Sequence, residues 1–259
     1  MTGNIRIEQT AEVATVWIDN PAKKNAIGRA MWIALGEAFA GFARSASLRC
    51  IVLRGAGEDA FGSGADIAEF STTRANRAQA TEFAHHVHGA MQQVRDCPVP
   101  TLAAIRGICV GGGLELAAVC DLRICTEDSR FAVPIARLGA TLAYAELQGL
   151  QDLVGPSVAL ELLLEGRTFG AAEALAKGLV GRVLARADFE AETAATVARI
   201  CAGAPLSARW HKRFVRRLRS PAPLTPDEIA EGLACFDTED YRTGYRTFLD
   251  KTTPTFVGR

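Results

Sequence analysis

The sequence predicts an α/β protein built on a mostly parallel β-sheet. Runs of apolar or alternating residues typical of strands are separated along the chain by stretches with helical periodicity, and this alternation favours parallel strand pairing. The strands are expected at residues 5–8, 13–18, 50–54, 101–105 and 122–125. The helices are expected at residues 29–45, 75–95 and 113–120. With 259 residues the chain is long enough to bury one sizeable core.

The second half of the chain is expected to be mainly helical. Beyond Ser157 the pattern is helical, apart from a short strand-like run at 178–183. From about Asp188 onward the chain has helical periodicity, with prolines at positions 205, 221, 223 and 226 among the residues that interrupt it. This predicts a helical C-terminal region attached to the α/β core.

Charge and hydropathy argue against nucleic acid and membranes as partners. Lysine and arginine total 29 and are balanced by 29 acidic residues, so any anion site must be local. The first twenty residues interleave polar and apolar side chains like a strand and not like a signal peptide. Arg106 and Glu115 interrupt the most apolar run, at 99–119. We therefore expect a cytoplasmic protein.

The cysteines and histidines do not predict a metal site. Seven cysteines occur without a CxxC pair and mostly in apolar surroundings, which indicates reduced thiols that fill the core. His85, His86 and His88 cluster on one expected helix without a nearby cysteine or aspartate to complete a ligand set. No metal is expected.

The most informative segment is Gly107–Ala118, an apolar strand followed by three glycines and a helix with an early carboxylate, Glu115. Adjacent glycines allow close approach of a ligand to the backbone, and a helix N-terminus aims free N–H groups at it. An oxyanion is one ligand that such N–H groups would bind. The alternative is a tight packing turn in which Glu115 only favours the helix N-terminus.

Several further motifs occur in an order and spacing that resembles the crotonase superfamily, also called enoyl-CoA hydratase/isomerase. They are Asn20-Pro21, Lys24-Asn25-Ala26, Phe61 to Ile67, Pro98-Val99-Pro100, the triple glycine, Cys120-Asp121-Leu122-Arg123, Gly166-Arg167, Ala176 and Gly178-Leu179-Val180. The resemblance implies a spiral core of repeated ββα units over residues 1–190 that binds acyl-CoA. It also implies a helical trimerisation region over 191–259, in a homo-trimer or a dimer of trimers.

The resemblance also assigns site residues. The backbone N–H groups of Ala65 and Gly112 match the pair that holds the thioester oxygen in the family, and Glu115 matches a catalytic carboxylate. Coenzyme A, which is part of the substrate and not a separate cofactor, would be anchored around Lys24, Asn25 and Ala26 and around Ala65, Asp66 and Ile67. Asp66 is expected to brace its own loop.

One position departs from the family pattern. Where hydratases have a second carboxylate, this chain has Ile135, which cannot move a proton. Tyr144 and Glu146, in the loop that follows, are candidates to replace it, or else a helix-start tyrosine and a surface glutamate. The expected activity is that of a hydratase or isomerase. The alternatives are a decarboxylase or thioester hydrolase of the same fold, or a CoA-ester-binding protein with little turnover.

Two groups of basic residues have alternative interpretations. Arg74 and Arg77 lie in the polar first part of segment 71–90, which is expected to line the acyl pocket. They either face water or, if one of them points inward, favour a carboxylated substrate. The basic run 209–219 is expected to be the solvated face of an amphipathic helix, with contact to CoA phosphates as the alternative.

Overall fold

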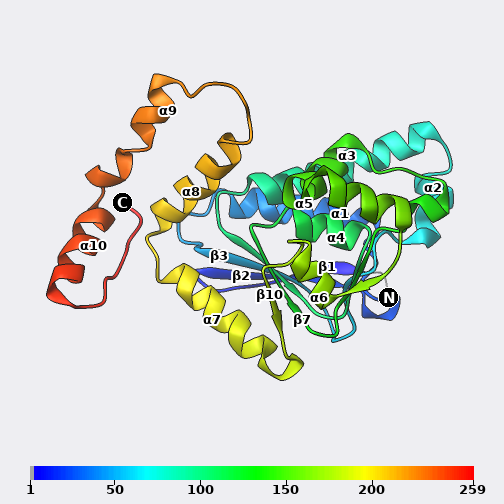
Figure 1. Ribbon diagram of the computed structural model, residues 1–259, viewed down its shortest axis with the longest axis horizontal. Helices are drawn as coiled ribbons and strands as arrows, with labels where there is room; N and C mark the ends of the chain where they lie inside the picture. Colours follow the sequence, from blue (N-terminus) through cyan, green and yellow to red (C-terminus); the bar gives the residue numbers. More distant parts are fainter. Residues whose placement is uncertain (1–2) are drawn as a thin grey trace.

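The structure is a computed structural model that describes residues 3–259, and it contains two sheets (Figure 1). The larger sheet has the strand order β1-β2-β3-β5-β7-β10 and is parallel except for the β1–β2 pair. Its strands are β1 (Asn4–Gln9), β2 (Val13–Asp19), β3 (Cys50–Gly55), β5 (Thr101–Ile105), β7 (Leu122–Thr126) and β10 (Arg182–Leu184). The smaller sheet has the order β4-β6-β8-β9, with strands β4 (Ala60–Gly62), β6 (Ile108–Val110), β8 (Arg130–Ala132) and β9 (Phe169–Gly170).

Burial explains the pattern of the central strands. All five residues of β5 are buried, which is why its sequence reads as a continuous apolar run, whereas β2 alternates between buried and half-buried residues. The expected strand at 178–183 is shorter in the structure and covers only β10. Leu179 and Val180 are buried in the turn that leads into it, so packing and not strand pairing accounts for their apolar character.

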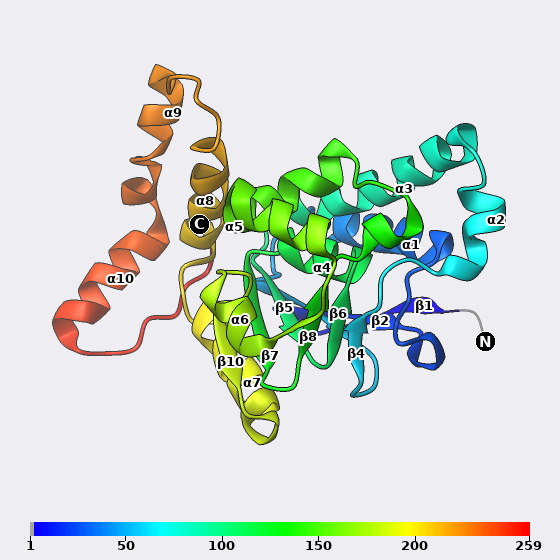
Figure 2. The same ribbon diagram turned by 45° about the vertical axis from the view of Figure 1, so that its right-hand side comes forward.

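Helices cover both faces of the larger sheet (Figures 1 and 2). One face carries α1 (Arg29–Phe42), α3 (Arg77–Asp96), α4 (Gly112–Ala118) and α5 (Tyr144–Glu165), and the other carries α7 (Phe189–Cys201). The remaining helices are α2 (Phe70–Thr73), α6 (Ala171–Ala176), α8 (Pro205–Arg217), α9 (Pro226–Glu231) and α10 (Glu239–Asp250). Together with these elements the two sheets form the expected α/β core with a helical C-terminal region.

The expected boundary between core and tail, at 190/191, falls inside α7. This helix packs on β3 and β7, and its first residue, Phe189, is fully buried in the cluster on that face of the sheet. Thr193 and Thr196 are buried as well. The helix therefore belongs to the core, and the part that stands apart from the core begins with α8 (Figure 1).

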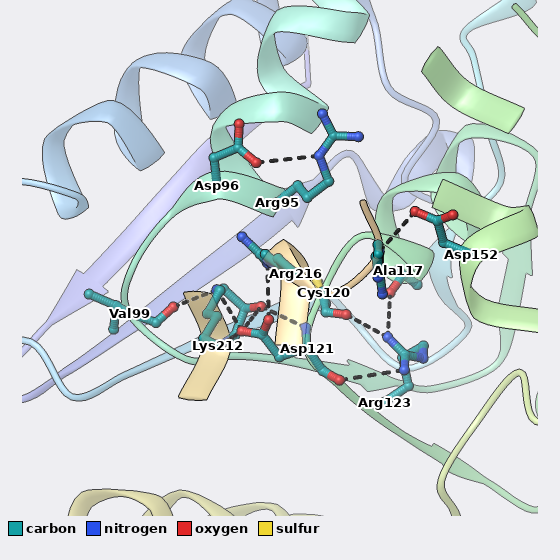
Figure 3. A network of polar contacts seen from close by, with 12 residues as sticks. Arg95, Asp96, Val99, Ala117, Cys120, Asp121, Arg123, Asp152, Lys212 and Arg216 are labelled. Atoms are coloured by element: carbon teal, nitrogen blue, oxygen red, sulfur yellow. Dashed lines mark hydrogen bonds and ion pairs between the residues drawn. The ribbon is translucent and has the colours of Figure 1, made fainter. Parts of the chain in front are cut away.

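The basic run on α8 is not a purely solvated face. Lys212 is 6% exposed, donates to the carbonyl of Val99 at 2.9 Å and pairs with Asp121 at 2.6 Å, and Arg216 pairs with the other oxygen of Asp121 at 3.1 Å (Figure 3). Arg209 donates to backbone carbonyls of the loop before β3. These cations attach the tail to the core, which the helical-wheel argument missed because it could not see their partners.

The tail exposes many large apolar side chains. Val215 is 62% exposed and Phe248 is 83% exposed. The others are Leu218, Leu224, Ile229, Leu233, Phe236, Tyr241, Tyr245, Leu249 and Val257. So much exposed apolar surface on one segment is typical of an interface with another chain. No helix among the described residues has the length and apolar character needed to cross a membrane.

The cysteines are free thiols, as expected. Five of the seven are buried, and burial raises the pKa of Cys50, Cys120 and Cys125 to about 12. They pack as small apolar side chains.

Candidate functional site

Two glycine-containing turns meet at the N-terminus of α4. A Cβ added to Gly113 would lie 2.4 Å from the carbonyl oxygen of Gly62, and a Cβ on Gly64 would lie 3.3 Å from that of Val110 and 3.5 Å from the nitrogen of Gly112. Any side chain at Gly113 would therefore push the two turns apart. Gly111 adopts φ 51°, a conformation that favours glycine, and turns the chain from β6 into the helix.

This contact brings two free amides together. Gly112 is the first residue of α4, where the N–H has no partner within the helix, and Ala65 follows Gly64 in the facing turn. In the chain from residue 3 to 259, neither N–H donates to a protein acceptor, since the bridge between Ile27 and this turn uses Gly64 and Asp66 instead. The arrangement leaves both N–H groups free to donate to a ligand.

A buried asparagine holds one side of this turn in place. The side chain of Asn25 accepts a hydrogen bond from the N–H of Asn20 at 2.9 Å and donates to the carbonyls of Ala56 and Ala60 at 2.9 and 2.7 Å. Lys24 and Asn25 both have positive φ, so the backbone here is tightly bent. Asn25 and Ala26 are buried, and only Lys24 of this predicted CoA-binding trio faces solvent.

Asp66 braces its loop, as expected. Its carboxylate accepts from the N–H of Ala68 at 3.1 Å and pairs with Lys23 at 2.6 Å. Ile67, the next residue, is 61% exposed although it is apolar. The rim formed by Lys24, Asp66 and Ile67, beside Ala65, therefore offers a ligand the apolar side chain of Ile67 and the exposed ammonium of Lys24.

Glu115 lies one turn into α4, three residues after Gly112. It is buried, and no described group hydrogen-bonds its carboxyl. Burial, and after it the charge of Glu146, raises the pKa of Glu115 to about 8, while Arg74 acts in the opposite direction. At pH 7 the carboxyl is therefore mostly protonated and can give up a proton near neutrality.

Tyr144 and Glu146, the two candidates to replace the second carboxylate, differ in their exposure to solvent. Tyr144 begins α5 and is 93% exposed, so within this chain it is not brought to Glu115, and its predicted proton-handling role gains no support. Glu146 is two residues further on and its side chain is only 14% exposed, with Oε2 accepting from the N–H of Ala143 at 2.7 Å. Its Oε1 lies 3.4 Å from Nε2 of His88 on α3. The structure therefore brings a second carboxylate toward Glu115 from α5.

Ile135 occupies the first position of a 3-10 helix (Ile135–Leu138) and packs against the hydrophobic core. It contributes an apolar wall where the family resemblance placed a carboxylate. Sequence reasoning missed His88 as a partner of Glu146, because the two residues are 58 positions apart and only the packing of α3 on α5 joins them.

The comparisons with known proteins were made across the whole chain. Residues 8–259 match the family model described as enoyl-CoA hydratase/isomerase. This chain is a member of that family. The expected spiral crotonase fold is confirmed by a crystal structure of an enoyl-CoA hydratase/carnithine racemase from Magnetospirillum magneticum, with a TM-score of 0.97 and 44% identity over 100% of this chain and 97% of that one.

Other members of the enoyl-CoA hydratase/isomerase family are more distant in sequence. An enoyl-CoA hydratase structure from Bacillus anthracis has a TM-score of 0.89 and 27% identity over 99% of this chain and 100% of that one. Crotonyl-CoA hydratase of Syntrophomonas wolfei is 29% identical over 99% of this chain and 98% of its own length. Carnitinyl-CoA dehydratase of Salmonella typhi is 28% identical over the full length of both chains.

Proposed function

We propose that this protein adds water to 2-enoyl-CoA thioesters. The observation that carries the proposal is the meeting of two unpartnered amides, at Ala65 and Gly112, with the buried, protonated Glu115 on the same short helix. The amides would hold the thioester oxygen as negative charge develops on it. Relatives named as enoyl-CoA hydratases support the choice of substrate class.

The two glutamates divide the proton transfers. Glu146 accepts a proton from water, whose oxygen bonds to C3 of the acyl chain, and electrons move from the C2–C3 double bond onto the thioester oxygen. Protonated Glu115 then donates its proton to C2 as the enolate collapses. The raised pKa of Glu115 suits it to the role of the acid. The rim at Lys24, Asp66 and Ile67 would hold the coenzyme A portion of the substrate.

The test is turnover of crotonyl-CoA by the wild type and by Glu115→Gln and Glu146→Gln. Hydration by the wild type, with a loss on the order of 10² to 10⁴ in kcat for each variant, supports the proposal. Unchanged turnover in either variant contradicts the role given to that residue. Absence of hydration in the wild type, despite binding of crotonyl-CoA, overturns the proposed function.

The apolar wall at Ile135 favours a second candidate, decarboxylation of a malonyl-type thioester. There the bond between C2 and the carboxylate breaks, carbon dioxide leaves, the amide pair holds the resulting enolate, and Glu115 protonates C2. Turnover of methylmalonyl-CoA without hydration of crotonyl-CoA would select this reaction.

We infer in addition that the protein assembles as a homo-trimer or a dimer of trimers through α8 to α10 and works in the cytoplasm. The exposed apolar side chains of the tail support the assembly. Sedimentation of the wild type and of Phe248→Asp tests it: a trimer or hexamer that dissociates in the variant is the expected result, and a monomeric wild type would contradict it.

A further inference from the structure

One half-buried cation next to the site lacks an anionic partner. Arg74 lies in the short link between α2 and α3, and its guanidinium carbon is 4.1 Å from the ring centre of Phe83 and 4.8 Å from that of Phe70. Its Nε is buried and unpartnered, and within residues 3–259 its guanidinium makes no ion pair. The stacked rings fix the position of the guanidinium without satisfying its donors.

Other poorly exposed cations in this protein are satisfied. Lys212 pairs with Asp121, and Arg123 donates to four backbone carbonyls. Arg54 and Arg106 also leave Nε without a partner, but both form an ion pair with Glu190. A guanidinium loses hydration when it is taken out of water, and the loss is offset only by hydrogen bonds or an anion. Arg74, by contrast, has no anionic partner among the described residues, and it lies near Glu115, where the acyl group of a substrate is expected to bind.

Arg74 also lies within electrostatic range of Glu115 and Glu146, the proposed acid and base. Glu146, Glu115 and Glu69 are the charged groups that act on it, and burial lowers the pKa of the guanidinium. None of the three neutralises it by contact. Glu115 is mostly protonated at pH 7, Glu146 is turned toward Ala143 and His88, and Glu69 accepts from the N–H of Arg29.

We propose that Arg74 recognises a carboxylate on the acyl group, so that the substrates are CoA thioesters of dicarboxylic acids. This inference rests on the proposed function and names its substrate class. A planar guanidinium in contact with two rings has parallel donors that match a carboxylate. The coenzyme A phosphates are the less suitable source of the anion, because Arg74 acts on Glu115 at the reacting end of the site and lies apart from the rim at Lys24 and Ile67.

The tail of the same chain does not supply the missing anion. Both views place α2 at the end of the molecule opposite to α9 and α10 (Figures 1 and 2). A carboxylate from a second copy of the chain is therefore the remaining protein source, and the experiment includes it as an outcome.

The test compares five-carbon acyl groups that differ only at their far end. Binding of glutaryl-CoA and pentanoyl-CoA is measured by calorimetry with the wild type and with Arg74→Met, which keeps an apolar stem over the rings but loses the charge. The matched control is Arg77→Met, on the exposed first turn of α3. We expect Arg74→Met to weaken glutaryl-CoA about 10- to 100-fold and pentanoyl-CoA less than threefold, with Arg77→Met affecting neither.

Three results would overturn the assignment. If Arg74→Met weakens both thioesters equally and the loss disappears with pantetheine thioesters, Arg74 binds phosphate. If it weakens both equally and also lowers the mass measured by light scattering, Arg74 pairs with a second copy of the chain. If it changes neither affinity, Arg74 has no ligand.

The same experiment separates this inference from the proposed function. Failure of the wild type to bind either thioester would count against an acyl-CoA site altogether. Binding of both with equal affinity, together with hydration of 2-pentenoyl-CoA, would leave the hydratase proposal standing and remove only the preference for a carboxylate.

Discussion

Nε2 of His88 lies 3.4 Å from Oε1 of Glu146, a contact that joins the middle of α3 to the first turn of α5. The two atoms are close enough for contact, but Nε2 makes no hydrogen bond. His88 therefore packs against Glu146 and limits the positions that its carboxylate can take. On the proposed mechanism it is a positioning residue that acts on the base.

Replacing His88 with asparagine should lower kcat about tenfold or more and leave KM nearly unchanged, because the base loses its orientation while the substrate keeps its contacts. Steady-state kinetics on crotonyl-CoA measure both constants. His85→Asn, at an exposed position of the same helix, is the control. An equal effect of the two substitutions would show that His88 has no special relation to Glu146.

The pH dependence of the reaction should show a descending limb near pH 8. The mechanism needs Glu115 protonated, and its pKa is raised to about 8, so kcat/KM should fall as pH rises through that value. Since Arg74 lowers this pKa, Arg74→Met should shift the limb to higher pH. If the descending limb lies at the same pH in the variant and in the wild type, Arg74 does not lower the pKa of Glu115.

Glu115→Gln should inactivate the enzyme but stabilise the fold. Between the ordinary pKa of a glutamate and about 8, the unfolded chain releases a proton that the folded chain keeps, so the free energy of unfolding falls as pH rises. Glutamine does not ionise, so the variant does not lose stability in this way as pH rises. We expect the variant to be more stable by on the order of 2 to 4 kcal/mol at pH 9 and by little at pH 4, as measured by urea unfolding. A pH-independent difference would contradict a buried, neutral Glu115.

Asp121→Ala should destabilise the protein by about 3 kcal/mol or more. Asp121 accepts from the N–H and hydroxyl of Thr101 and pairs with Lys212 and Arg216, so its loss leaves a buried ammonium without an anionic partner. Thermal unfolding measures the change. Asp96→Ala, which breaks an exposed pair with Arg95, is the control and should cost about 1 kcal/mol or less.

Most of the fold could be predicted because its signals are local. The strand of residues 101–105 and the helix near 75–95 follow from apolar runs and periodicity, and the structure has them at Thr101–Ile105 and Arg77–Asp96. The free amide of Gly112 follows from glycines before a helix. The expected boundary at 190/191 lies within α7, because nothing in a sequence pattern tells whether that helix packs on the sheet.

The polar part of the site was harder to predict. The sequence offered Tyr144 and Glu146 as equal candidates, and only the direction in which α5 begins separates an exposed tyrosine from a half-covered glutamate. It likewise offered Arg74 and Arg77 together. The two are distinguished by the rings of Phe70 and Phe83, which come from different helices and hold only Arg74.

The interior thiols give this protein a built-in chemical reporter of opening. Alkylating reagents react with thiolates, and burial keeps Cys50, Cys120 and Cys125 protonated and out of contact with reagents. Cys50 and Cys125 lie in strands of the large sheet, and Cys120 lies just after the helix that carries Glu115. Labelling rates at these three positions, resolved by mass spectrometry, would therefore show whether the sheet and the catalytic helix open together or separately.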